Sequence, residues 1–120
     1  MSKSAKSLVV FAIYLFLLGS LLILVPNLVL SVFRIPETVE VWIRVVGTLV
    51  TILGYYYLQA ARNNLITFFK TTVYGRFSVL VFFIAFVVFK LAPPVLILFG
   101  GIDAAGAVWT ASYLRAENTA

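Results

Sequence analysis

One acidic residue stands inside a long apolar stretch near the C-terminal end of the sequence. Asp103 lies in the first half of a predicted membrane helix over 94–114, and no other acid is placed so deeply in an apolar run. An acid at the centre of a bilayer costs about 2.5–3.5 kcal/mol on insertion scales, so such a group usually faces the interior of a bundle. Small residues share its helical face or lie beside it: Gly100, Gly101, Ala104, Ala105, Ala107, Thr110 and Ala111. This face is predicted to pack against protein rather than lipid.

Two arginines are placed to reach toward Asp103. Arg76 opens a predicted helix over 72–91, and Arg44 lies in the first turns of a predicted helix over 39–61. The predicted helix over 39–61 also carries a stripe of polar residues at helical spacing, composed of Arg44, Gly47 or Thr48, Thr51, Tyr55 and Arg62. We expect an intramembrane polar site formed by Asp103, Arg76, Arg44, Thr51 and Tyr55.

The chemistry open to such a site is narrow. The sequence has no cysteine and no histidine, and its one methionine is the initiator, which excludes thiolate metal sites, haem ligation and histidine acid–base catalysis. It also contains no phosphate loop, zinc motif or paired carboxylates. We therefore predict no catalytic residues, no cofactor and no metal. Asp103 and its partners then form either a proton, cation or headgroup site or a buried pair that fixes helix register.

The composition is that of a membrane protein. The chain has 120 residues, of which 63% are hydrophobic and 11% are charged, whereas a soluble domain carries about 25% charged residues. The length allows one domain, residues 1–120. The net charge is +5, but the basic residues are scattered between apolar runs, so they are predicted to orient the chain in a membrane rather than to bind nucleic acid.

Four apolar segments approach the roughly 20 residues that span a bilayer as a helix. They cover about 8–25, 39–61, 72–91 and 94–114 and predict an all-α membrane protein, a four-transmembrane-helix bundle. The segment after Pro26 is too short to span and is expected at the membrane surface. A shift of 56 residues aligns FRI (33–35) with FKL (89–91), which suggests two tandem helical hairpins as a further hypothesis.

The basic residues predict an orientation with both termini inside. An inside N-terminus places Lys3, Lys6, Arg62, Lys70, Arg76 and Arg115 on the inner side, and Arg34, Arg44 and Lys90 on the outer side. This distribution follows the positive-inside rule. The first apolar stretch is too long for a cleaved signal peptide. We expect an integral protein of the bacterial inner (cytoplasmic) membrane with both termini cytoplasmic.

Several short motifs carry a family resemblance. They are LVLSVFRIP after Pro26, WIRVVG (42–47), YYYLQAAR (55–62), the Gly75–Arg76 pair and GGIDAAGA (100–107). With them, the chain resembles small uncharacterised bacterial four-helix membrane proteins that are DoxX-like in size and layout. The resemblance implies an architecture and carries over no catalytic residues.

Three classes of function remain open at this point. The favoured one is a non-enzymatic accessory or assembly protein whose polar face docks on a partner or on a second copy. The alternatives are a small transporter or channel that uses Asp103, and a lipid- or quinone-binding module. The expected partners are membrane lipid and either a homo-oligomer or a larger membrane complex. Polar groups that satisfy one another would favour a structural role, and polar groups that line a wet cavity would favour transport.

Overall fold

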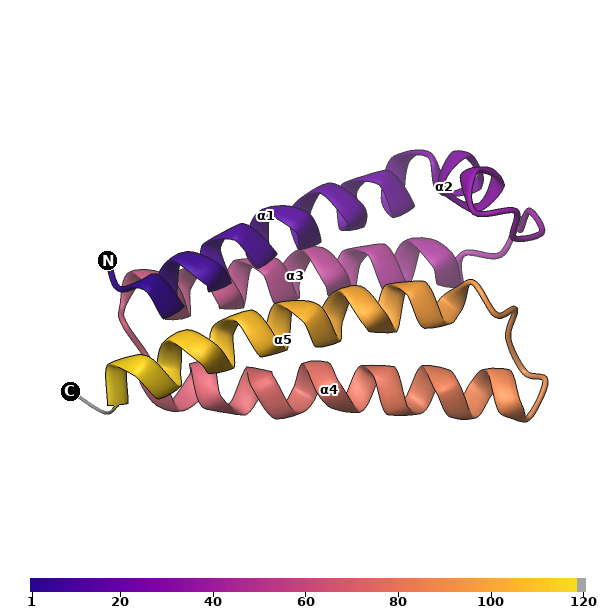
Figure 1. The fold of residues 1–120 in the computed structure, drawn as a ribbon. Helices are drawn as coiled ribbons and strands as arrows, with labels where there is room; N and C mark the ends of the chain where they lie inside the picture. The colour runs from indigo at the N-terminus through magenta and orange to yellow at the C-terminus, as the bar shows by residue number, and fades with distance from the viewer. Residues whose placement is uncertain (119–120) are drawn as a thin grey trace. The chain divides into compact units, whose positions relative to one another are not determined.

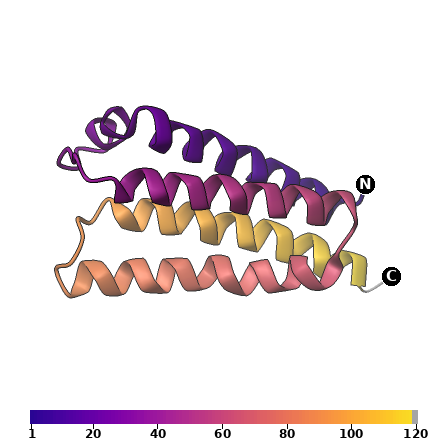
Figure 2. The same ribbon diagram turned by 180° about the vertical axis from the view of Figure 1, so that it is seen from behind.

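The computed structural model describes residues 1–118, which form five α-helices (Figures 1 and 2). The helices are α1 (Lys3–Leu24), α2 (Pro26–Val32), α3 (Trp42–Arg62), α4 (Ile66–Val88) and α5 (Leu96–Asn118). The chain divides into two compact units. Unit 1 contains residues 1–8 together with the chain from Ala60 onward, and unit 2 contains Val9–Gln59.

In the described part of the chain, three helices are long and apolar enough to cross a membrane, namely α1, α4 and Leu96–Glu117 of α5. The prediction of a four-transmembrane-helix bundle is therefore wrong. The helix that falls short is α3, which is long enough at 21 residues but carries Arg44, two threonines, Gln59 and Arg62. Sequence inspection counted α3 as an apolar run because valine, leucine and isoleucine fill most of the positions between these polar groups. Its apolar residues concentrate on one side, which is typical of an amphipathic helix.

The boundaries of α4 change the place of Arg76. The helix begins at Ile66, whereas the sequence suggested a start near residue 72. The apolar ring of Phe69 is fully buried in this added part, which explains why the segment is helical instead of a surface connection. Arg76 therefore lies near the middle of a 23-residue helix and not at its start.

Three helix ends use a residue in the left-handed region. Arg34, Asn64 and Lys90 have φ values of 57°, 51° and 59° and follow α2, α3 and α4. The backbone N–H after each one reaches back to close the helix: Ile35 to the Leu30 carbonyl (2.8 Å), Leu65 to the Ala60 carbonyl (3.0 Å) and Leu91 to the Phe86 carbonyl (2.7 Å). This is a common helix end. FRI (33–35) and FKL (89–91) thus share a helix-end geometry. The short helix α2 has no counterpart between α4 and α5 in the described residues.

In unit 2, α1 and α3 approach each other at glycines. A Cβ atom added at Gly19 would lie 2.8 Å from the Gly47 carbonyl oxygen, and one added at Gly47 would lie 2.9 Å from the Gly19 carbonyl oxygen. A Cβ at Gly54 would lie 3.2 Å from the Ala12 carbonyl oxygen. Gly47 and Gly54 are two turns apart on one face of α3, so this face packs directly against the α1 backbone.

In unit 1, α4 and α5 run antiparallel and pack along their length (Figures 1 and 2). Gly100 lies against α4, because a Cβ added there would be 3.0 Å from the Cα of Leu80. The first turn of α1 belongs to the same unit. Unit 1 thus joins two apolar helices to the N-terminal end of a third, and it holds the polar groups described next.

Candidate functional site

The buried polar and charged side chains of the described residues all lie in unit 1. They are Ser4, Ser7, Thr72, Arg76 and Thr110. They come from the start of α1, from α4 and from α5. Because unpaired polar groups are costly inside a membrane, the partners of each one indicate what the cluster does.

The start of α1 is bonded to the end of α5. The backbone N–H of Ser4 donates to Oε1 of Glu117 at 3.1 Å, and the Ser4 hydroxyl donates to Oε2 at 2.6 Å. The Ser2 hydroxyl accepts from the Ala5 N–H at 3.1 Å and caps the same helix end. A carboxylate is favourable at this position because helix N-termini carry partial positive charge. Glu117 is therefore a capping group for a helix far away in sequence.

One turn further along α1, a second hydroxyl pair joins the same two helices. The Ser7 hydroxyl lies 2.7 Å from the Thr110 hydroxyl and donates to the Ser4 carbonyl at 2.6 Å. A hydroxyl has one proton to donate, so Thr110 is the donor within the pair. Both side chains are buried, and both are satisfied inside unit 1.

Arg76 is the buried cation of the cluster, with 2% of its surface exposed. Its Nε donates to the Thr72 carbonyl at 3.2 Å, and its Nη2 donates to the Thr72 hydroxyl at 3.1 Å. The Thr72 hydroxyl in turn donates to the Phe69 carbonyl at 2.8 Å. Across the α4–α5 contact, Asp103 is half-buried and close enough to Arg76 for an electrostatic interaction. Two of the predicted site residues are therefore brought together.

The other three predicted site residues belong to unit 2, where each has a contact of its own. Nη1 of Arg44 donates to the Ile23 carbonyl in the last turn of α1. The Thr51 hydroxyl donates to the Gly47 carbonyl at 2.9 Å. Tyr55 is 52% exposed, and its ring centroid lies 6.3 Å from that of Tyr56. Arg76 and Asp103 belong to the other unit, and the five-residue site stays a prediction.

Sequence reasoning missed Ser4, Ser7 and Glu117 as members of the cluster. Ser4 and Ser7 stand in the polar stretch before the first apolar run, and their spacing of three places them on one helical face. Glu117 stands among polar residues after the last apolar run. Its position held a clue, since an acid in the last turn of a helix is unfavourable for that helix. An acid placed there is more stable with a partner elsewhere, and here the partner is the α1 N-terminus.

The arrangement offers hydroxyls, one carboxylate cap and one arginine–aspartate pair. Such groups hold helices together and can pass protons. Within residues 1–118, no group of three or more His, Cys, Asp or Glu side chains lies together as metal ligands would. Comparison with protein-family models, with curated proteins and with solved structures found no match to the chain. The resemblance to DoxX-like proteins therefore stays a prediction.

Proposed function

We propose that this chain is a non-enzymatic accessory or assembly protein of a membrane. The observation that carries the proposal is the pairing of buried polar groups within unit 1. Ser4 pairs with Glu117, Ser7 pairs with Thr110, and Arg76 pairs with Thr72 and interacts with Asp103. Groups that satisfy one another fix the positions of helices, and each such bond contributes about 0.6–2 kcal/mol inside a membrane.

The amphipathic helix α3 supports the same role. Among residues 1–118, it is the one long helix that is not apolar enough to be a candidate membrane span. The face of α3 that carries Gly47 and Gly54 packs against α1, while Leu49, Ile52 and Tyr56 remain exposed. We propose that partner proteins or further copies of the chain cover part of α3, as an accessory subunit requires.

The proposed location is the bacterial inner membrane with both termini in the cytoplasm. Three crossings alone would place the termini on opposite faces, so this orientation requires α3 to lead the chain back between the faces, shielded from lipid by its contact with α1 and by partners. The bonds between Ser4 and Glu117 support this orientation, because they hold the start of α1 beside the end of α5. Lys3, Lys6 and Arg115 lie close to these residues in the chain, and basic residues favour the cytoplasmic face.

A double-mutant cycle on Arg76 and Asp103 tests the structural role. We expect Arg76→Gln and Asp103→Asn each to lower the free energy of unfolding in detergent micelles by about 1–3 kcal/mol. Each single variant leaves one buried charge without its partner, whereas the double variant removes both charges. The double variant should therefore lose less stability than the sum of the two single losses. Additive losses with no coupling between the two positions would contradict a structural pair.

A small transporter is the second candidate, and one observation favours it. Glu117, Ser4, Ser7 and Thr110 form a file of hydrogen-bonding groups that starts at the end of α5 and continues along the helix face of Asp103. Proton flux into proteoliposomes under an imposed potential distinguishes the two candidates. An accessory protein gives the background rate, and Asp103→Asn changes nothing. A flux that Asp103→Asn abolishes, in a protein of unchanged stability, would replace the first proposal with the second.

A further inference from the structure

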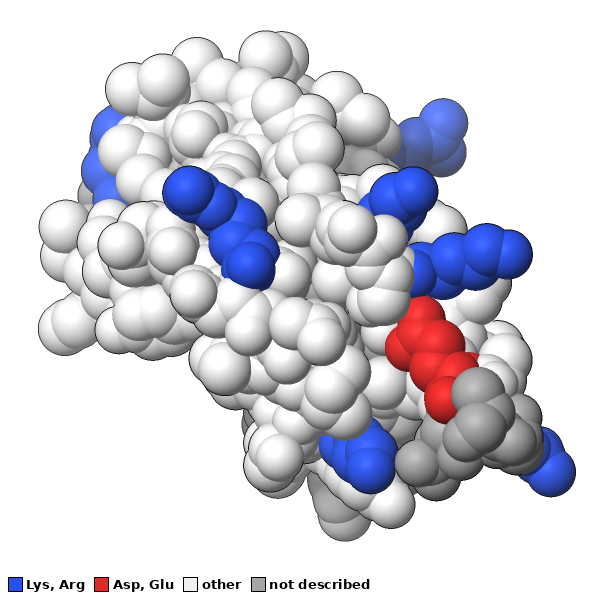
Figure 3. Space-filling model, turned by 90° about the vertical axis from the view of Figure 1, so that its left-hand side faces the viewer, with Lys and Arg blue, Asp and Glu red and all other residues white. Residues whose placement is uncertain are grey.

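The end of unit 1 where α1 begins and α5 finishes is strongly basic. Its exposed basic side chains are Lys3, Lys6, Arg62, Lys70 and Arg115. Figure 3 looks onto this end and shows basic side chains spread across it, with acidic atoms at one place. The acid at this end is Glu117, whose two carboxylate oxygens already accept bonds from Ser4. The positive charge of this end is therefore largely uncompensated within the unit.

A pocket of about 450 Å³ opens at this end. It is lined by Met1, Ser2, Ala61, Arg62 and Asn64. The turn that shapes one side of it depends on Asn64, whose left-handed conformation ends α3 and starts the connection to α4. A guanidinium and an amide are thus gathered around one opening, and both can donate hydrogen bonds to phosphate oxygens.

We propose that this pocket binds the headgroup phosphate of an anionic phospholipid. Clusters of four to eight basic residues directly beside membrane helices are typical of anionic-lipid binding. Because α1, α4 and α5 are apolar enough to span a bilayer, their ends lie at the level of the headgroups. Leu65 stands next to Asn64 and is 50% exposed, so it offers an acyl chain an apolar surface beside the pocket. A free phosphate ion would use the polar groups alone. The inference does not depend on the accessory role.

Native mass spectrometry of the full chain in detergent tests the proposal, with phosphatidylglycerol and phosphatidylcholine added separately. Wild type should retain phosphatidylglycerol in preference to phosphatidylcholine, and higher ionic strength should weaken that retention. Arg62→Gln should lower the affinity for phosphatidylglycerol about fivefold, the loss expected for one basic residue near an anionic surface. Arg62 is exposed, so the variant should keep the wild-type helicity and thermal stability, which are measured in parallel.

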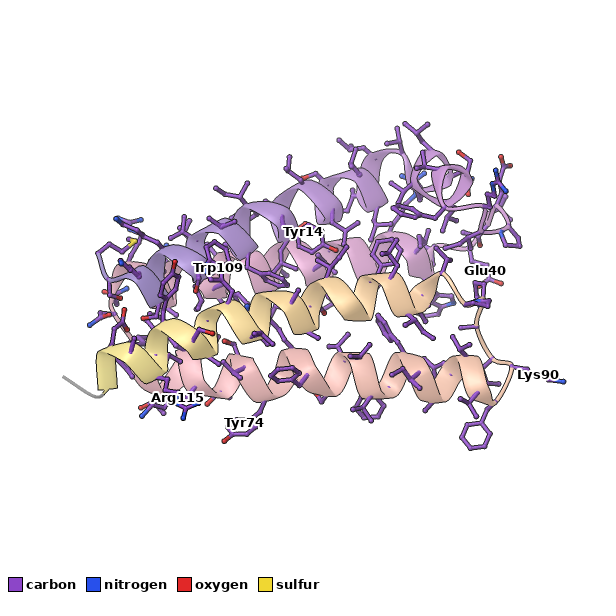
Figure 4. All side chains as sticks on the ribbon, in the orientation of Figure 1. Tyr14, Glu40, Tyr74, Lys90, Trp109 and Arg115 are labelled. Carbon is purple, nitrogen blue, oxygen red and sulfur yellow. The ribbon has the colours of Figure 1, made fainter. Side chains whose placement is uncertain are left out.

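Lys90→Gln is the matched control. It removes one exposed positive charge from the turn at the opposite end of the α4–α5 pair from Arg115, as Figure 4 shows. It should bind phosphatidylglycerol as wild type does. Equal retention of both lipids, or equal losses for Arg62→Gln and Lys90→Gln, would overturn the proposal. Displacement of the lipid by millimolar inorganic phosphate would assign the pocket to free phosphate instead.

Discussion

Gly19 of α1 and Gly47 of α3 pack with their backbones in direct contact, each one against the carbonyl oxygen of the other. A Cβ at either glycine would lie under 3.0 Å from that oxygen, closer than real Cβ atoms approach. At Gly19 the added atom would also meet the Thr51 hydroxyl and the Thr51 amide nitrogen. Two of these three obstacles are backbone atoms, so a rotamer change cannot make room.

Gly19→Ala should therefore destabilise unit 2. Insertion of a methyl group into a packed contact costs about 1–3 kcal/mol, and the better helix propensity of alanine offsets less than about 1 kcal/mol of it. The free energy of unfolding in mixed micelles is the quantity to measure. Truncation of Thr51 to alanine should not rescue the variant, because the Gly47 carbonyl and the Thr51 backbone remain in place.

Gly75→Ala and Gly101→Ala are the controls for that measurement. A Cβ at either position would meet no atom within 4 Å, and both glycines lie inside long helices. We expect unchanged or slightly increased stability from helix propensity. If all three alanine variants behaved alike, the close approach of α1 and α3 would be refuted.

Ser4→Ala should weaken the link between the start of α1 and the end of α5. The variant loses the 2.6 Å bond to the Glu117 carboxylate and keeps the backbone bond. Hydrogen bonds to charged groups contribute about 1.5–3 kcal/mol, so a loss near the lower end is expected. Ser112→Ala is the matched control, because Ser112 is exposed and bonds to its own helix. A loss at Ser4 no larger than the loss at Ser112 would show that the link adds no stability.

Ser7→Ala should cost more stability than Thr110→Val. Ser7 makes two hydrogen bonds, to the Ser4 carbonyl and to Thr110, whereas Thr110 contributes to one of them. We expect losses of about 1–2 kcal/mol and about 0.5–1 kcal/mol, and a double variant that loses less than the sum. Thermal and SDS-induced unfolding of the three variants provides the comparison. The reverse order would contradict the finding that Ser7 makes both hydrogen bonds and Thr110 only one of them.

Single cysteines can report the orientation, since the natural chain contains none. Ser2→Cys and Arg115→Cys should react with an impermeant maleimide from the cytoplasmic side, because the bonded ends of α1 and α5 lie together. Lys90→Cys should react from the other side, since α4 and α5 are each about 34 Å long. Labelling of Ser2→Cys and Arg115→Cys from opposite faces would refute the proposed location of the termini.

Much of the helical architecture is predictable from the sequence. Apolar runs located α1, α4 and α5, because lipid-facing helices need an unbroken apolar surface. The same criterion overestimated the ability of α3 to span a membrane. The glycines and threonines of α3 are suited to contact with another helix. The start of α4 was also misplaced, because polar residues around Lys70 resemble a surface loop while Phe69 is buried between them.

The polar cluster was only half predictable. Asp103 is predictable because an acid in an apolar run is costly, and Arg76 was one of the two arginines predicted to reach toward it. The roles of Ser4, Ser7 and Glu117 could not be predicted from the sequence, because serine and glutamate are common in solvated chain ends. Only the fold brings residues 113 positions apart into one hydrogen-bonded pair.

The bonds by which Glu117 caps α1 can form only late in the synthesis of the chain. During synthesis α1 emerges first, and its capping carboxylate follows 113 residues later. At about 5–20 residues per second, the ribosome adds Glu117 roughly 6–23 s after Ser4. Before that moment, of these two capping groups only the Ser2 hydroxyl can cap the α1 N-terminus. The capping bonds at the first turn of α1 are therefore completed only when the last turn of α5 has been made.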